Sequence, residues 1–240
     1  MSAINLDPTP AHANINEWFG PTIQGEGPHA GQRVGFLRFA GCNLSCSWCD
    51  TPYSWDWDRF DRDQESHPMT IAQIAEQINP MQVKRLIITG GEPLLQQRNI
   101  PAIKAATGCL IDIETNGTRR PLPETIDAVD LFNVSPKLSF ASDPEERRII
   151  EDAMEVFAVL SKVGRAIFKF VCEKPEDFEE VRQIRDRFDI PNDAIWIMPE
   201  GYTQDQHLKH LRELATPIVN EGWNLSSRIH VLAWEKIRKA

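Results

Sequence analysis

The sequence lacks the features that would place a protein at a membrane or on a nucleic acid. No apolar run reaches the about 18 residues that a transmembrane helix needs. Basic residues are outnumbered, 26 Lys and Arg against 35 Asp and Glu, and the net charge of −9 argues against anionic partners, although a local basic pocket stays possible. The N-terminus shows no basic segment followed by an apolar one, so we expect no secretory signal and a cytoplasmic location.

Repeats, linkers and low-complexity segments are missing as well, so we expect a single domain over residues 1–240. Hydrophobic residues make up 41% and charged residues 25% of the chain, a composition that excludes a disordered protein. Cysteine is scarce, yet three of the five cysteines fall between positions 42 and 49. Without an export signal, this crowding indicates metal or redox chemistry in a reducing compartment.

Apolar, β-rich runs alternate with helical patterns along the chain. The predicted strands are Val34–Phe39, Arg85–Thr89, Leu110–Glu114, Leu131–Ser135, Ala166–Val171, Ala194–Met198 and Arg228–Leu232. The predicted helices are one that begins after a capping box at Thr70 and Gln73, and those over Asp143–Lys162, Pro175–Phe188 and Gln204–Asn220. This alternation predicts an α/β fold with a parallel sheet of six or seven strands.

A closed βα barrel needs eight strands in ~250 residues, and no GxGxxG fingerprint follows the first predicted strand. We therefore expect a partial βα barrel rather than a doubly wound sheet. The acidic stretch 54–67, which contains Trp55 and Trp57, is interpreted as a loop insertion.

The least ordinary segments of the sequence lie directly after predicted strands. They are GCNLSCSWCD, GGEP, ETNG, SPK and MPEG. In a βα barrel the loops that follow the strands meet at one face, and active sites form there. We therefore expect these five segments to surround one site.

Cys42, Cys46 and Cys49 have the spacing CxxxCxxC in the first of these segments. Three thiolates on one short loop can bind three irons of a 4Fe–4S cluster and leave the fourth iron open to a small molecule. A structural zinc site is the alternative, but zinc commonly takes four ligands, and Cys109 and Cys172 stand alone on or beside other predicted strands. The pattern favours a three-ligand cluster.

With Trp48 at its aromatic position, this loop resembles that of the radical S-adenosylmethionine (SAM) superfamily. The segments GPTIQGEGPHAGQRVGFLRFAGCNLSCSWCDT, ITGGEPLLQ, IETNGT and NVSPK, in this order, narrow the resemblance to the 7-carboxy-7-deazaguanine synthase family, over about residues 17–137. The resemblance implies a lyase that converts 6-carboxy-5,6,7,8-tetrahydropterin to 7-carboxy-7-deazaguanine and ammonia, an early step of queuosine-type 7-deazapurine biosynthesis. SAM would be regenerated and act as a cofactor.

The resemblance also implies the cofactor contacts. Cys42, Cys46 and Cys49 would hold the cluster, and Thr51 would ligate Mg²⁺. The residues implied to bind SAM are Trp48, Cys49, Asp50, Gly91, Glu92, Asn116, Ser135, Pro136, Lys137, Met198, Pro199 and Glu200. From the residues alone, an ordinary turn is the favoured interpretation of GGEP and of the Asp50–Thr51 pair, and ETNG fits an Asn-Gly turn as well.

For the pterin, the resemblance implies binding by Ile23, Gln24, Gly25, Arg38, Thr89, Glu114 and His230, of which Arg38, Glu114 and His230 would be catalytic. Because side chains alternate between the two faces of a strand, Arg38 and Phe36 share one face. If that face lines the inside of a barrel, the buried arginine needs an anion as its partner. A solvent-facing or salt-bridged arginine is the alternative. His230 is also compatible with a structural role, and Lys169 in IFKFV receives no role.

Relatives further imply a homodimer and an electron donor such as a flavodoxin or ferredoxin, with no nucleic-acid or membrane partner. Some members end in a proline whose carboxylate reaches the substrate site. This chain ends VLAWEKIRKA, so we expect that contact to be absent or replaced. Two rival functions stay open: a glycyl-radical-enzyme activase that acts on a protein partner, and a zinc-stabilised binding module. Pterin dependence and metal content would separate them.

Overall fold

One sheet organises the molecule. The computed structural model describes residues 12–235 and 238, in which nine strands have the order β3-β1-β2-β4-β5-β6-β7-β8-β9. Their bounds are β1 Ala13–Ile23, β2 Arg33–Phe39, β3 His67–Met69, β4 Arg85–Gly90, β5 Leu110–Thr115, β6 Leu131–Val134, β7 Ala166–Cys172, β8 Ile195–Pro199 and β9 Asn224–Leu225. The expectations about a signal at residues 1–11 and about the chain end at 236, 237, 239 and 240 lie outside the described residues.

Neighbouring strands from β2 to β9 run parallel, whereas β1 pairs antiparallel with both β2 and β3. The order never reverses between β2 and β9, so every crossover turns the same way and the sheet curls instead of forming a doubly wound core. The predicted partial βα barrel is confirmed.

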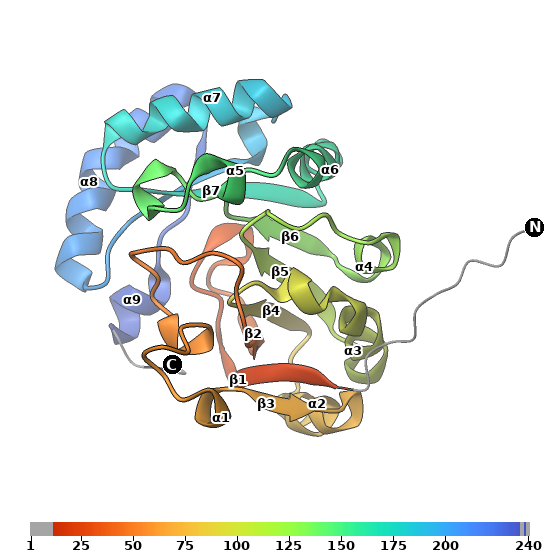
Figure 1. Ribbon diagram of the computed structural model, residues 1–240. Coiled ribbons are helices and arrows are strands. Elements are labelled where there is room, and N and C mark those ends of the chain that lie inside the picture. The colour runs from red at the N-terminus through yellow and green to blue at the C-terminus, as the bar shows by residue number, and fades with distance from the viewer. Residues whose placement is uncertain (1–11, 236–237, 239–240) are drawn as a thin grey trace, which may run out of the picture.

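Most of the helices cover the outside of the curved sheet, as Figure 1 shows. Their bounds are α1 Arg62–Glu65, α2 Ile71–Ile78, α3 Ile100–Thr107, α4 Pro123–Ala128, α5 Glu145–Arg148, α6 Glu151–Ser161, α7 Phe178–Phe188, α8 Gln204–Glu221 and α9 Ile229–Trp234. Within the described ranges, none of these helices has the length and apolar character needed to cross a membrane.

The two faces of the sheet differ in chemistry because side chains alternate along a strand. Ile111 and Ile113 of β5 are fully buried in the core between sheet and helices, whereas Asp112 and Glu114 lie on the opposite, inner face. The same alternation places Asn133 on β6 and Lys169 on β7 between two buried apolar residues, and Thr89 on β4 after the buried Ile88. The inside of the barrel is therefore polar.

Most predicted elements are confirmed. The six predicted strands from Val34–Phe39 to Ala194–Met198 correspond to β2, β4, β5, β6, β7 and β8. The capping box before α2 is also present, since Gln73 N donates to Thr70 Oγ1 (3.2 Å) and Thr70 N donates to Gln73 Oε1 (2.9 Å).

The predicted strand at Arg228–Leu232 is wrong, because Ile229–Trp234 forms helix α9. The last parallel strand is the two-residue β9, four residues earlier in the chain. After β9 the chain turns inward: Ile229 N donates to Gly25 O (2.9 Å), and Val231 N and Leu232 N donate to Arg228 O. The tertiary bond to Gly25 and the local helical bonds to Arg228 O override the alternating pattern of the sequence.

Two further segments differ from their predictions. The helix predicted over Asp143–Lys162 is divided into α5 and α6, because Ile149 and Ile150 both have extended backbone angles. Consecutive β-branched side chains favour that conformation over a helix. The stretch 54–67 is more than a loop, since it contains helix α1 and ends in β3 on the edge of the sheet.

The capping box at Thr70 gives a test of local stability. We expect Thr70→Ala to lower the free energy of unfolding by about 1 kcal/mol, because Gln73 N at the start of α2 loses the Thr70 hydroxyl that accepts its hydrogen bond. Urea unfolding followed by circular dichroism measures this. Thr216→Ala, in the exposed middle of α8, is the matched control and should not destabilise the protein; equal losses in both variants would contradict the assignment.

Candidate active site

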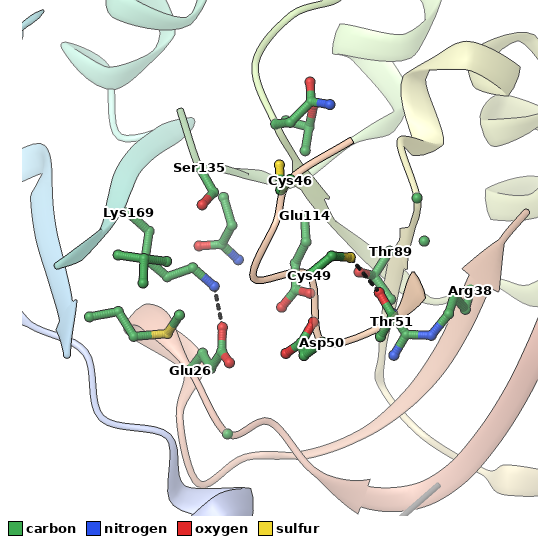
Figure 2. A pocket seen from close by; sticks show the side chains of 18 of the residues that line it. Glu26, Arg38, Cys46, Cys49, Asp50, Thr51, Thr89, Glu114, Ser135 and Lys169 are labelled. Carbon is green, nitrogen blue, oxygen red and sulfur yellow. Dashed lines mark hydrogen bonds and ion pairs between the residues drawn. The ribbon is translucent and has the colours of Figure 1, made fainter. Parts of the chain in front are cut away.

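A cavity of about 260 Å³ opens at the carboxyl ends of the parallel strands. All five unusual sequence segments contribute to its wall, as predicted. The predicted site residues that line it are Ile23, Gln24, Gly25, Arg38, Cys42, Cys46, Trp48, Cys49, Asp50, Thr51, Thr89, Gly91, Glu114, Asn116, Ser135, Lys137, Met198, Glu200 and His230. Figure 2 shows how residues from separate strands point into this one space. Glu92, Pro136 and Pro199 belong to the same segments but not to the lining.

The cysteine loop lies over this cavity and is held by hydrogen bonds to other segments of the chain. Ser45 donates through both its N and its Oγ to the carboxylate of Asp143 (3.0 and 3.2 Å), and Asn43 Nδ2 donates to Thr118 Oγ1 (2.8 Å). These bonds fix a segment that has no regular secondary structure, so its three thiols face the cavity together.

The donor set fits a cluster with three protein ligands. Cys42, Cys46 and Cys49 line the cavity, while Cys109 and Cys172 are buried elsewhere, just before β5 and at the end of β7. No thiol is left nearby as a fourth ligand for a closed four-cysteine site. Burial raises the pKa of the Cys42 thiol to about 12 and also raises that of Cys46, so binding of iron has to displace their protons.

Two aromatic residues outside the cysteine loop, Trp55 and Phe140, contact it. Trp55 Nε1 donates to Cys49 Sγ (3.3 Å), which gives the supposed insertion a direct contact with a cysteine ligand. Trp48 stacks on Phe140 with ring centroids 5.5 Å apart, and Lys137 Nζ lies 5.4 Å from the centre of its ring. Hydrogen bonds to cysteine sulfur tune the potential of an iron–sulfur cluster.

The GGEP turn sits directly under the cysteine loop. Glu92 N donates to Gly41 O (2.8 Å), and a Cβ on Gly91 would lie 2.2 Å from that oxygen and 2.8 Å from Cys42 Cβ. The Glu92 carboxylate is fully buried and accepts from Leu94 N, Asn116 N and Thr115 Oγ1 at 2.7–2.9 Å. Burial raises its pKa, and its contacts join the GGEP and ETNG segments.

The part of the cavity away from the cysteine loop, here called its lower part, is polar. Gln24 Nε2 donates to Glu114 Oε1 (3.1 Å), which holds the carboxylate on the inner face of β5. Arg38, on the inner face of β2, is 14% exposed at the side chain and donates through Nε to Glu17 Oε1 (2.8 Å). Among the described residues, the two terminal nitrogens of Arg38 have no protein acceptor.

Sequence reasoning missed a buried ion network at the base of the cavity. Glu26 pairs with Lys169 and accepts from Arg228 Nε (3.1 Å), and Arg228 NH2 donates to Asp50 Oδ2 (2.6 Å). Burial opposes ionisation of Glu26, but Lys169 and Arg228 outweigh it and hold the pKa of Glu26 well below its usual range. Glu26 belongs to the segment TIQGEG, and Lys169 received no role from the sequence. The charged Lys169 in the otherwise apolar strand IFKFV was the signal that could have indicated a buried ion pair.

His230 also reaches this network. It lies on α9 rather than on a strand, and its Nε2 is 3.8 Å from Glu26 Oε1. Burial lowers the pKa of His230, which favours the neutral ring. The histidine therefore lines the cavity as predicted, although the element that carries it was predicted wrongly.

Comparison with known proteins agrees with this geometry. The family model of the Radical SAM superfamily matches residues 37–188, and a 7-carboxy-7-deazaguanine synthase of Pyrobaculum aerophilum is 33% identical over 90% of this chain and 93% of its own. The chain belongs to the 7-carboxy-7-deazaguanine synthase family of radical SAM enzymes. Another member, from Halobacterium salinarum, is 32% identical over 92% of this chain and 90% of its own.

A solved structure shares the fold of this synthase-family chain. It is described as the crystal structure of QueE from Escherichia coli, and it matches with a TM-score of 0.64 and 23% identity over 90% of this chain and 93% of its own. Radical SAM enzymes carry a 4Fe–4S cluster and SAM, and the three-cysteine loop is the part of this chain that fits the cluster.

The contact between Gly91 and Gly41 leads to a prediction. We expect Gly91→Ala to reduce iron incorporation to a small fraction of wild type, because its Cβ would collide with backbone under the cysteine loop. Iron and sulfide per chain after anaerobic reconstitution measure this. Gly164→Ala is the matched control: it meets open space at a φ of +71° and should cost about 1 kcal/mol of stability without loss of iron. Normal iron content in Gly91→Ala would show that the contact does not support the loop.

Proposed function

We propose that this protein converts 6-carboxy-5,6,7,8-tetrahydropterin to 7-carboxy-7-deazaguanine with release of ammonia. One observation carries the proposal: the three-cysteine loop and the open end of the Arg38 guanidinium face the same cavity. A site for a radical cofactor beside an arginine fork suits a substrate that carries a carboxylate. The product would be an early intermediate of queuosine-type 7-deazapurine biosynthesis.

In this proposal the upper half of the cavity, next to the cysteine loop, holds the cofactors. Cys42, Cys46 and Cys49 bind the cluster, and Trp48, Gly91, Asn116, Ser135 and Lys137, with the 198–200 segment, surround SAM. Glu92 contributes by holding Asn116 in place, since its carboxylate accepts from Asn116 N (2.7 Å). When bound, the cluster and SAM supply the radical chemistry that removes one hydrogen atom from the pterin and returns it later.

The lower half of the cavity orients the pterin. Arg38 has two free N–H₂ groups for the carboxylate, and Glu114, held by Gln24, accepts from the N–H groups of the pyrimidine edge. Thr89 and His230 complete the wall, and the neutral ring of His230 can accept or donate a hydrogen bond. The barrel keeps water away from these groups and holds the substrate in one orientation.

Thr51 is the proposed protein ligand of Mg²⁺. Thr51 lines the cavity, and its hydroxyl is 3.8 Å from Cys49 Sγ, so its oxygen could serve as a metal ligand beside the cysteine loop. Mg²⁺ commonly keeps several waters and substrate oxygens in its shell, so one protein ligand is sufficient. We further propose a cytoplasmic location, because the three cluster cysteines need a reducing compartment. As in the relatives that the sequence resembles, the protein would be a homodimer that receives electrons from a flavodoxin or ferredoxin.

The test is anaerobic turnover of reconstituted protein with SAM, a reductant, Mg²⁺ and the carboxytetrahydropterin, followed by mass spectrometry. We expect 7-carboxy-7-deazaguanine to form while SAM is conserved, and turnover to fall when Mg²⁺ is removed by a chelator. Cleavage of SAM without conversion of the pterin would contradict the substrate and favour a glycyl-radical-enzyme activase. Zinc without iron in the purified protein would contradict the cofactor as well.

A substitution tests the role of Arg38. We expect Arg38→Lys to raise KM for the carboxytetrahydropterin about tenfold, because lysine keeps the charge and loses the planar fork that matches a carboxylate. Steady-state kinetics at saturating SAM measure this. Arg33→Lys is the matched control on the same strand, where Arg33 donates to the carbonyls of Met81 and Gln82 outside the cavity. An unchanged KM in Arg38→Lys would exclude a bidentate contact.

A further inference from the structure

The first strand contains an irregularity that sets the surroundings of Arg38. Ile15 of β1 lies opposite Phe39 of β2, but Glu17 lies opposite Arg38, so Asn16 is an extra residue in β1. Such a bulge shifts the alternation of the strand by one. Ile15 faces the outer core, and without the bulge Glu17 would face the same way. With it, the Glu17 carboxylate points to the inner face beside Arg38.

Glu17 is a buried carboxylate with three donors. Its side chain is 1% exposed. Oε1 accepts from Arg38 Nε (2.8 Å) and from Tyr53 OH (3.1 Å), and Oε2 accepts from Arg238 Nε (2.8 Å). Burial by itself would raise the pKa of Glu17, but the two guanidinium groups hold it below its ordinary value. The carboxylate is therefore charged between two arginines.

The bond to Glu17 decides which part of Arg38 is available. Because Nε is engaged, rotation of the guanidinium about its stem is restricted, and the edge formed by the two terminal nitrogens is directed into the cavity. Figure 2 shows the Arg38 side chain extending toward Thr51 and Thr89. A planar group held at one corner loses less freedom when it binds a carboxylate with the opposite edge.

The same bond has an electrostatic cost for anion binding. An ionised Glu17 beside Arg38 makes a pair of zero net charge, which attracts a second carboxylate weakly. Arg238 offsets this cost: Glu17, Arg38 and Arg238 together carry a net charge of +1, and the negative charge of Glu65, which balances that sum, contacts the other two nitrogens of Arg238 and not Arg38. Arg238 also binds Glu65 (2.7 Å) and lies over the Tyr53 ring, 3.9 Å from its centre, so it is fixed on the outer side of Glu17.

We propose that Glu17 is a positioning residue for Arg38 and that Arg238 is the outer counter-charge that keeps this site attractive to the carboxylate of the substrate. The inference rests on the proposed function, in which Arg38 binds that carboxylate. It assigns a substrate-affinity role to an arginine that lies outside the cavity lining, and it makes the Asn16 bulge part of the binding site.

Two fluorescent probes separate the carboxylate contact from the rest of the ligand. The holoenzyme with SAM is titrated with 6-carboxypterin and with 6-hydroxymethylpterin, which lacks the carboxylate, and the ratio of the two dissociation constants measures the carboxylate preference. We expect Arg238→Gln to lower this preference about three- to tenfold, more at low than at high ionic strength. KM for the carboxytetrahydropterin should rise by the same factor with kcat unchanged.

Conservative variants distinguish this role from a structural one. Arg238→Lys keeps the charge but loses the paired contact with Glu65, so it should retain the preference even if thermal stability falls. Glu17→Asp keeps the charge but shortens the reach to Arg38, so it should lower the preference about threefold. Arg59→Gln, which removes an exposed arginine paired with Asp56, is the matched control and should change nothing.

Each result has a distinct meaning. An unchanged preference in Arg238→Gln would overturn the counter-charge, and an unchanged preference in Glu17→Asp would overturn the positioning role. Loss of preference in Arg238→Lys equal to that in Arg238→Gln would show that Arg238 acts through structure alone. If the wild-type holoenzyme itself did not prefer the carboxylated probe, the assignment of Arg38 in the proposed function would be wrong instead.

Discussion

An incomplete barrel has no backbone ladder between its first and last strands, and in this protein the Glu26 carboxylate connects the two ends. The sheet stops at β3 on one edge and at β9 on the other. Glu26, in the loop after β1, pairs with Lys169 of β7 and with Arg228 just beyond β9. The neighbouring backbone adds two bonds, from Ile229 N to Gly25 O and from Gly27 N to Ser226 Oγ. Without this connection the cavity would lack a base.

The price of this closure is a set of charges inside the barrel, and each has to be compensated because buried ions lose their hydration. Glu26 is compensated by two cations, and Glu17 by two others. The groups that have no partner indicate what the cavity can bind. In the described part of the chain, the terminal nitrogens of Arg38 face the cavity without a protein acceptor, so this arginine, although paired with Glu17, can still bind an anion. Charge compensation and substrate selection are thus parts of the same arrangement.

The sequence predicted the parallel strands, the helix start at Thr70 and the convergence of the five segments, because these follow from local patterns and from the geometry of βα units. It did not predict β1, whose bulge interrupts the alternation, or β9, which has only two residues. Arg228–Leu232 alternates like a strand, yet its hydrogen bonds to the loop after β1 make it turn. The partners of Arg38 could not be inferred, since Glu17 and Arg238 are separated by 221 residues and meet only in the folded chain.

The extra residue at Asn16 also bears on how sequences of this kind are compared. Upstream of it the first strand is in one phase with respect to the sheet, and downstream it is in the other, so Ile15 and Glu17 face opposite sides although they are two residues apart. A relative that lacked this residue would present a different set of β1 side chains to its cavity, even with an identical sequence after the deletion. The length of this segment is therefore as much a determinant of the inner surface as the identity of its residues.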